Sequence, residues 1–375
     1  MVHTGLSGNE IYCLQKVGYK PGNILIGNSV FSMGFLGGVR SNLRSAVGGE
    51  IKQYTEMIAE GRRLSLQRLE KEVTDFGAIG ATGITNELVM HPENIEFLSV
   101  GSALHTDAEG KSKFTSAADG QELYCQIDAG YEPVSFVFGN VAYSIGIGKS
   151  FLGGLRTLVR GEIPEYTNIF THTRNLALER IQKEAKSAGA NVITEIKTTI
   201  IPFKQAGVQE MLMLGTASKH DGLPQDQVAT CDLTCQELWN MTELGYIPMK
   251  LMLGTSVYSL GVAGSIGSTI RGFFKGEINQ LTTLIYEARE KSLGKITAEA
   301  KAIGADDIIG IQTYIYSLGS GLIEFLAIGT AMKYVGNTVT TKSHALIPQA
   351  IIRDIDTFCN TADMSFGYDL SKQVR

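Results

Sequence analysis

The sequence is poor in the residues from which disulfide frameworks and soft-metal sites are built. It has five cysteines and six histidines among 375 residues. An odd number of cysteines does not form the paired framework typical of small secreted proteins. The N-terminus has neither a basic start nor an apolar core, so it does not resemble a secretory signal. We therefore expect a reducing, cytoplasmic location.

The chain also lacks a basic cluster and a strongly apolar span. The net charge is −5, so the positive footprint of a nucleic-acid-binding protein is missing, and we expect no nucleic-acid partner. Residues 251–270 and most of 21–39 carry little charge, and about 20 apolar residues suffice to cross a bilayer. Glycine, serine and threonine dilute the hydropathy of both segments, so we expect no membrane insertion.

The sequence does contain a threefold internal repeat, which sets the architecture. The segment Ile26–Gly34 (IGNSVFSMG) returns as Phe138–Gly146 (FGNVAYSIG) and as Leu253–Gly261 (LGTSVYSLG). We place copy 1 at residues 7–105, copy 2 at 119–220 and copy 3 at 234–334. Polar linkers separate them at 106–117 and 221–233, and the tail 335–375 matches nothing earlier.

Each copy opens with the pattern of a short capped helix. Capping boxes are predicted at Ser7/Glu10, Asp119/Glu122 and Thr234/Glu237. A glycine about ten residues later predicts the helix end, at Gly18, Gly130 and Gly245. A Tyr-x-Pro sequence follows in every copy, and proline there launches an extended chain.

A strand, a long helix and two further strands complete each copy. The first strand contains Gly27, Gly139 or Gly254, which predicts a bulge or a close backbone approach. A Gly-Glu pair precedes a long helix with an apolar stripe, and a Gly-Ala pair ends it. The fold class is therefore α+β, with three helix-β-α-β-β repeats. Met211 and Met213 face away from Leu212 and Leu214, so both faces of the last strand are expected to be buried.

These features resemble the YbjQ family, whose members carry a heavy-metal-binding label. The resemblance rests on the Gly-Glu pair, the arginine within the long helix, the Gly-Ala pair and the closing Gly-Thr-Ala. It implies a dodecin-subunit-like sheet with a long helix, and single-domain members that close into a five-membered ring. It also implies a metal ion as the candidate cofactor.

Five charged positions stay in register across the copies. They are Arg44/Arg156/Arg271, Glu50/Glu162/Glu277, Arg62/Arg174/Arg289, Glu72/Glu184/Glu299 and Glu96/Glu210/Glu324. The last glutamate lies in an apolar strand, where a lone carboxylate is costly, so we expect it to be buried against an in-register arginine. The arginines and these glutamates form either an anionic-ligand site or structural ion pairs between copies, and we favour the ion pairs.

Candidate metal ligands do not repeat. Cys231 and Cys235, with His220 upstream, form the one cluster with soft ligands, although two cysteines do not close a tetrahedral site. Cys13 and Cys125 align, but copy 3 has Asn240 at that position. Aligned carboxylates for a hard cation remain an alternative.

No catalytic arrangement recurs in the three copies. The sequence around Lys149 has Tyr143 where a phosphate loop needs glycine, and no Ser/His/Asp or Cys/His set repeats. We expect a non-enzymatic module for assembly or for binding a small ligand. The alternatives are a heavy-metal-binding protein and an enzyme with a site between repeats.

The predicted assembly is pseudo-cyclic. Small sheets have edges that must be paired or covered, so consecutive copies are expected side by side. Three-copy chains cannot fill a five-membered ring. We expect self-association between repeats or chains, closing either three copies within one chain or six in a dimer, with the 335–375 tail covering a seam.

Overall fold

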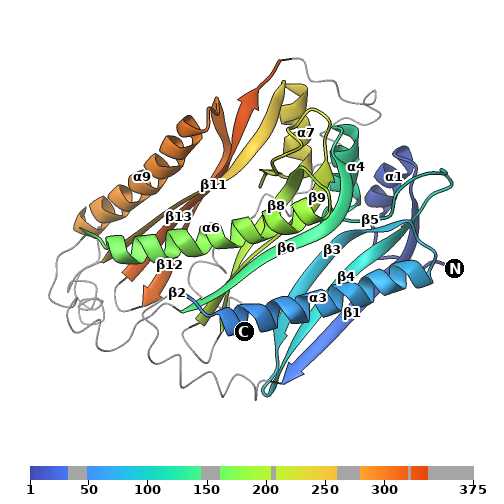
Figure 1. The fold of residues 1–375 in the computed structure, drawn as a ribbon, viewed down its shortest axis with the longest axis horizontal. Coiled ribbons are helices and arrows are strands. Elements are labelled where there is room, and N and C mark those ends of the chain that lie inside the picture. The colour runs from blue at the N-terminus through green and yellow to red at the C-terminus, as the bar shows by residue number, and fades with distance from the viewer. Residues whose placement is uncertain (33–48, 145–160, 204–207, 260–278, 320–321, 337–375) are drawn as a thin grey trace.

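The computed structural model describes residues 1–32, 49–144, 161–203, 208–259, 279–319 and 322–336. Each copy contains a short helix, a strand, a long helix and two closing strands, as predicted (Figure 1). Copy 1 has α1 (Gly8–Lys16), β1 (Lys20–Ser32), α3 (Lys52–Asp75), β3 (Gly80–Met90) and β4 (Asn94–His105). Copy 2 has α4 (Gly120–Asp128), β6 (Glu132–Ser144), α6 (Pro164–Ser187), β8 (Val192–Phe203) and β9 (Val208–Lys219). Copy 3 has α7 (Cys235–Glu243), β11 (Tyr246–Ser259), α9 (Asn279–Ala302), β12 (Asp307–Gly319) and β13 (Leu322–Tyr334).

Two of the three predicted capping boxes form. Ser7 caps α1 and Thr234 caps α7, each with the reciprocal glutamate bond. In α4, Asp119 accepts bonds from the backbone, but the return bond from Glu122 is missing from the cap. Its carboxylate instead accepts the backbone N–H of Gln236 at 2.8 Å, at the start of α7. The prediction of a full box at Asp119 is therefore wrong, because the glutamate is used between copies.

The strand glycines allow the long helices to approach the strands closely. A Cβ atom on Gly27 would lie 2.0 Å from the carbonyl oxygen of Ser65 on α3. Equivalent atoms on Gly139 and Gly254 would lie 2.2 Å from helix carbonyl oxygens. The register shifts of β1, β6 and β11 lie near their prolines instead. Of the two expectations for these glycines, the close approach is the one the structure has.

Short strands join each copy to the next. Sheet 1 has the order β1-β4-β3-β5, sheet 2 the order β10-β8-β9-β6-β2, and sheet 3 the order β12-β13-β11-β7. β2 (Gly49–Glu50) comes from copy 1 but pairs with β6 of copy 2, and β7 (Gly161–Glu162) of copy 2 pairs with β11 of copy 3. The linkers contribute β5 (Phe114–Thr115) and β10 (Ala229–Thr230), which pair in parallel with β3 and β8. Each linker is thus part of a sheet.

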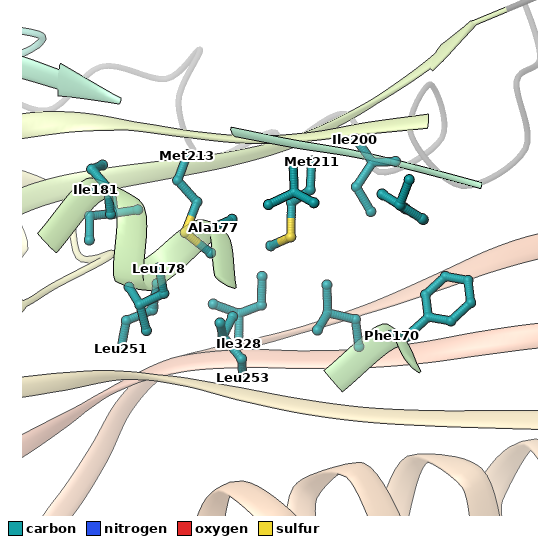
Figure 2. Close-up of a cluster of buried hydrophobic side chains, with 14 of the residues drawn as sticks. Phe170, Ala177, Leu178, Ile181, Ile200, Met211, Met213, Leu251, Leu253 and Ile328 are labelled. Carbon is teal, nitrogen blue, oxygen red and sulfur yellow. The ribbon is translucent and has the colours of Figure 1, made fainter. Parts of the chain in front are cut away.

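Two of the long helices are shared between neighbouring sheets. α3 packs against β1 and β4 of its own copy and against β6 of the next copy. α6 lies in the same way between sheets 2 and 3. In Figure 2, Phe170, Ala177, Leu178 and Ile181 of α6 lie between strand residues of sheet 2, such as Met211 and Met213, and residues of sheet 3, such as Leu253. The copies therefore lie side by side and share cores.

The short helices form a second zone of contact between copies. α1 packs on α4, and α4 packs on α7. The single tryptophan, Trp239 of α7, is buried there and donates its Nε1–H to Asp128 of α4 at 3.1 Å. Its ring meets Tyr124 edge to face, so the aromatic side chains fix this contact in space.

In the part of the chain that the structure describes, the row of copies is open at both ends. The burial pattern of β1 alternates along the strand, whereas almost every residue in the second half of β6 and β11 is buried. Sheet 1 thus has one uncovered face, and Arg289 on α9 is exposed at the other end. The described part of the chain therefore does not show the expected closure of three copies within one chain. Residues 337–375, predicted to cover a seam, lie outside the described part of the chain.

None of the helices that the structure describes has the length and apolar character needed to cross a membrane.

Candidate functional site

The interface between copies 1 and 2, called the first joint, contains a buried ion pair. The interface between copies 2 and 3 is the second joint. Arg62 of α3 donates through Nε to Glu210 Oε1 at 3.1 Å and through Nη2 to Oε2 at 2.7 Å. Both side chains are completely buried. The geometry is the bidentate fork that gives arginine–carboxylate pairs their directional preference. The arginine comes from copy 1 and the glutamate from β9 of copy 2, so the pair specifies which faces meet.

The remaining donor of Arg62 is satisfied within copy 1. Its Nη1 donates to the backbone oxygen of Asn86 at 2.9 Å and to the side-chain oxygen at 2.7 Å. The Asn86 amide in turn donates to Ser99 Oγ at 2.8 Å. A fully satisfied network of this kind makes an otherwise costly buried charge tolerable.

The second joint repeats the pair one copy further along. Arg174 of α6 donates to both carboxylate oxygens of Glu324, with the shortest distance 2.7 Å. Its Nη1 donates to the Tyr143 hydroxyl at 3.2 Å, and its guanidinium lies 5.5 Å from the centre of the Phe170 ring. Burial alone would lower the pKa of Arg174, but the Glu324 carboxylate raises it, so the arginine stays charged.

Among the described residues, the third glutamate and the third arginine of these sets, Glu96 and Arg289, have no arginine–glutamate partner of this kind. Glu96 of β4 is partly exposed and accepts from His91 Nε2 at 3.0 Å, and hydrogen bonds from His91 and Asn28 lower its pKa. Arg289 is exposed. The expectation of a buried glutamate on an in-register arginine is thus confirmed for Glu210 and Glu324. For Glu96, the described residues show instead a partly exposed side chain paired with His91. Arg44, Arg156, Arg271 and Glu277 lie outside the described residues.

The other glutamate sets also serve the joints or the strand edges. Glu50 pairs with Arg180 of copy 2 at 2.6 Å, and Glu162 pairs with Lys291 and Lys295 of copy 3. Glu72 accepts the backbone N–H of Ile26 at 2.8 Å, and Glu184 accepts that of Phe138 at 2.7 Å. Glu72 and Glu184 thus accept hydrogen bonds from backbone N–H groups at strand edges, which could otherwise pair with a strand of another molecule.

Several residues in the joints were not predicted as site residues. Thr55 Oγ1 accepts the backbone N–H of Ala142 in copy 2 at 3.0 Å, and Thr167 Oγ1 accepts that of Val257 in copy 3 at 2.9 Å. Threonine recurs in register as Thr282, so a signal existed. Basic residues likewise recur at Arg68, Arg180 and Lys295, where each donates to an edge-strand carbonyl.

An unusual acidic cluster lies between α4, α7 and β8. Glu195 has a φ of +54°, the one positive φ among the described non-glycine residues, where copies 1 and 3 have Gly83 and Gly310. Its carboxylate pairs with Lys197 at 2.9 Å and lies 3.7 Å from Cys235 Sγ. Burial, and then the charge of Glu195, raise the pKa of the neighbouring Glu122 to about 8. The sequence signal was the glutamate at a position that is glycine in the other copies.

The candidate metal ligands do not gather around one point. Cys231 and Cys235 are fully buried in the apolar cluster under the short helices, and burial raises the pKa of both thiols. His220 instead stacks on Tyr131 at 4.3 Å, and its Nδ1 accepts the Gly222 N–H. Within the described residues, no group of three or more histidine, cysteine, aspartate or glutamate side chains is arranged to hold an ion.

A groove of about 420 Å³ lies on the first joint, between α3 and α6. Its floor is the edge strand β6 at residues 138–140, and Arg63 and Lys183 line opposite walls. Arg63 lies 3.7 Å from Glu184 and is more than half exposed. The second joint has Asn175 and Ala298 at the equivalent positions, so the Arg63 and Lys183 charges are particular to the first joint.

A family model matches the chain three times, at residues 17–104, 129–221 and 247–335. The model is that of YbjQ, described as "Putative heavy-metal-binding". The matches cover more than half of the chain. The chain belongs to the YbjQ family. The resemblance inferred from the repeat is thereby confirmed, as are the tandem copies.

The relatives of this YbjQ chain match it over different lengths, one over more than two hundred residues and others over fewer than one hundred. The encapsulin nanocompartment protein of Mycobacterium tuberculosis is 29% identical over 231 residues, covering 58% of this chain and 85% of the relative. UPF0145 proteins of Clostridium novyi and Archaeoglobus fulgidus are 39% and 41% identical over 88 and 86 residues, covering 84% and 79% of their own lengths. No solved structure matches significantly. Neither the family description nor these names state a reaction.

Proposed function

We propose that the protein is a non-enzymatic assembly subunit, whose role is to build a larger particle by self-association. One observation carries this proposal: both internal joints bury a sheet face, while no described residue covers the equivalent face of sheet 1. Ile24, Ile26 and Val30 of β1 are 40%, 50% and 57% exposed. Contiguous exposed apolar side chains of this kind mark interaction surfaces.

The construction of the joints supports the same role. Each joint combines a shared helix, an exchanged two-residue strand and a bidentate ion pair. Such joints are extensive and directional, as expected of surfaces selected to fix one arrangement. The relative named as an encapsulin nanocompartment protein is in keeping with a role in assembly.

The test of this function is the solution mass of the full chain across a range of concentrations. One chain has a mass of 40.5 kDa. Light scattering should give a mass of at least two chains at micromolar concentration, falling only on strong dilution. A mass of one chain at every concentration would contradict the proposal.

A second candidate function, binding of a small anion, rests on the groove between α3 and α6. Arg63 of α3 and both Arg180 and Lys183 of α6 line it, and Arg180 is already paired with Glu50. Titration with inorganic phosphate and pyrophosphate by calorimetry tests this idea. Arg63→Asn and Lys183→Ala, which install the residues of the second joint, should abolish the heat of binding. Arg68→Ala, a basic residue outside the groove lining, serves as the control, and equal binding by all proteins argues against the site.

Metal binding remains a prediction that the family description motivates. Its test is metal analysis of the protein purified without a histidine tag. Stoichiometric zinc, copper or cadmium that is lost on replacing Cys231 and Cys235 with serine would support the metal-binding alternative.

A further inference from the structure

The two uncovered surfaces at the ends of the row are counterparts of surfaces that already meet inside the chain. At one end is the outer face of sheet 1, formed by Ile24, Ile26 and Val30 of β1, Val89 of β3 and Glu96 of β4. At the other end is the outer face of α9, formed by Thr282, Tyr286 and Arg289. The internal joints show what these faces contact when a neighbour is present.

The outer face of sheet 1 matches faces that are buried elsewhere. Its equivalents in sheet 2 are Phe136, Phe138 and Ala142, and in sheet 3 Leu251, Leu253 and Val257, all buried against the long helix of the preceding copy. The apolar side chains of sheet 1 are smaller than the phenylalanines of sheet 2, but they occupy the same positions. A long helix of this family is therefore the element that fits this face.

The outer face of α9 is the matching helix surface. Thr282, Tyr286 and Arg289 occupy positions i, i+4 and i+7, one face of the helix. Their equivalents on α3 are Thr55, Ala59 and Arg62, which are buried against sheet 2. Thr55 accepts the backbone N–H of Ala142, and Arg62 donates two hydrogen bonds to the Glu210 carboxylate. Tyr286, 59% exposed, adds an aromatic ring where α3 has a methyl group.

The charges on the two faces are complementary. Both internal joints place an arginine of one copy on a glutamate of the next, and the unmatched members are Arg289 at one end and Glu96 at the other. In the single chain, Glu96 is held by His91. Its position opposite Val30 in the strand register equals that of Glu210 opposite Ala142.

The short helices also contact one another from each copy to the next. Glu10 of α1 accepts the N–H of Gly120 at the start of α4 at 3.2 Å, and Glu122 of α4 accepts that of Gln236 at the start of α7. Glu237, the equivalent on α7, is exposed at the end of the row. At the other end, a side chain added at Gly8 of α1 would meet open space.

We propose that a second copy of this chain occupies both ends, with α9 of each chain covering sheet 1 of the other and Arg289 pairing with Glu96 across the seam. This proposal rests on the assembly function and names its surface. The contact is heterologous, because two different faces meet, so it must close into a ring or continue as a filament. Two chains close it with two identical seams, which gives a ring of six copies.

Charge reversal tests the seam. Glu96→Arg alone and Arg289→Glu alone place like charges at every seam, so each protein should have the mass of one chain. A one-to-one mixture of the two should recover the mass of two chains, because every seam in a mixed pair joins opposite charges. The Glu96→Arg/Arg289→Glu double variant should also recover it. Both residues are partly or largely exposed in the single chain, so thermal unfolding monitored by circular dichroism should show folded proteins throughout.

Glu109→Arg and Lys301→Glu are the matched controls, since they make the same charge changes at exposed positions off both faces, and they should keep the wild-type mass. If the wild-type protein self-associates but the single reversals leave its mass unchanged, the seam is wrong and the assembly function stands. Folded single variants that fail to recover in the mixture also overturn the seam. A wild-type mass of three or more chains overturns the two-chain ring, and a mass of one chain overturns the assembly function itself.

Discussion

Arg62 and Arg174 show why single residues in this molecule come in inter-copy pairs. Each is a large cation with no exposed surface, and each has its carboxylate in the following copy. Removing one partner of a buried pair leaves an uncompensated charge, which costs far more than the intact pair contributes. Substitution of Glu210 or Glu324 is therefore expected to lower the stability of the folded protein strongly.

Glu210→Gln is expected to lower the free energy of unfolding by about 3–5 kcal/mol, because it leaves Arg62 buried without its counter-charge. Denaturant unfolding measures the change. The matched control is Glu96→Gln, the equivalent glutamate at a partly exposed position, measured on dilute protein so that chains are separate. The control should change stability by no more than about 0.5 kcal/mol. Equal effects of the two substitutions would contradict the assignment.

Glu195→Gly is expected to stabilise the protein. A non-glycine residue at positive φ carries strain on the order of 1 kcal/mol or more, and copies 1 and 3 have glycine at this position. The substitution also removes a buried carboxylate next to Glu122. Thermal unfolding should show a higher Tm, whereas Glu195→Gln, which keeps the strain, should raise it less. A lower Tm for Glu195→Gly would indicate that the pair with Lys197 outweighs the strain.

Part of the residue-level picture was predictable. The in-register glutamate within an apolar strand indicated burial and an arginine partner, and Glu210 and Glu324 confirm it. The copy that supplies the partner was not predictable, since residues in register are equivalent within the sequence. The exposure of Glu96 follows only from its place at the end of the row.

At the scale of helices and strands, the N-terminus of each short helix is a contact point for its neighbour. The carboxylate of Glu122 lies at the start of α7, where backbone N–H groups and the helix dipole favour an anion. Burial, Glu195 and Asp119 oppose that ionisation and raise the pKa of Glu122 to about 8. This contact is therefore linked to pH.

The stability of the protein is expected to fall as the pH rises from about 5 to about 8. The folded state holds the Glu122 proton over this window, whereas an unfolded glutamate has lost it, so folding binds a proton and is disfavoured by alkali. Thermal unfolding between pH 5 and 9 measures the slope. Glu122→Gln should reduce the slope, and the part that remains includes Asp232, whose pKa burial raises to about 7. An identical slope for Glu122→Gln would refute the linkage.

The strand and helix glycines are expected to respond oppositely to alanine. Gly139→Ala would place a methyl group 2.2 Å from the Ala177 carbonyl, forcing α6 from β6 at a cost of about 1–3 kcal/mol. Gly294 lies within α9 with nothing within 4 Å of an added Cβ, so Gly294→Ala should stabilise by about 0.5–1 kcal/mol. Denaturant unfolding measures the free energy of unfolding of both variants. Destabilisation by Gly294→Ala would contradict the open surroundings of that glycine.

The order and type of the elements followed from local chemistry, because caps, stop glycines and apolar periodicity act within a few residues. The exchanged strands β2 and β7 did not, since two residues before a helix carry no pattern of their own. The capping box predicted at Asp119 and Glu122 was wrong for a related reason. The same sequence pattern suits a capping box and a contact with α7, and the Glu122 carboxylate makes the contact with α7.

At the scale of the whole molecule, the copies share their hydrophobic cores. α3 and α6 each complete two sheets, so the copies do not have independent cores. The sequence indicated side-by-side packing through strands that are apolar on both faces. It could not show that the row stays open, since that depends on the direction in which each helix covers the next sheet.

Unfolding of the full chain is expected to be a single cooperative transition in spite of the three repeats. Trp239 fluorescence reports on the joint of copies 2 and 3, and far-ultraviolet circular dichroism reports on all helices. Their unfolding curves in denaturant should coincide, as two-state behaviour requires. A fluorescence change well separated from the loss of helix would mean that the copies unfold one by one, as independent modules.

The sharing of α3 also has a consequence for synthesis on the ribosome. One side of α3 packs on sheet 1 within its own copy, but its other side has no partner until β6 has left the exit tunnel, and β9 follows more than a hundred residues after the end of α3. The carboxylate that neutralises Arg62 arrives only with Glu210. Copies 1 and 2 thus complete their packing only when the next copy has been translated. A chain that stalls after copy 1 leaves Arg62 without its carboxylate and one apolar face of α3 exposed to water.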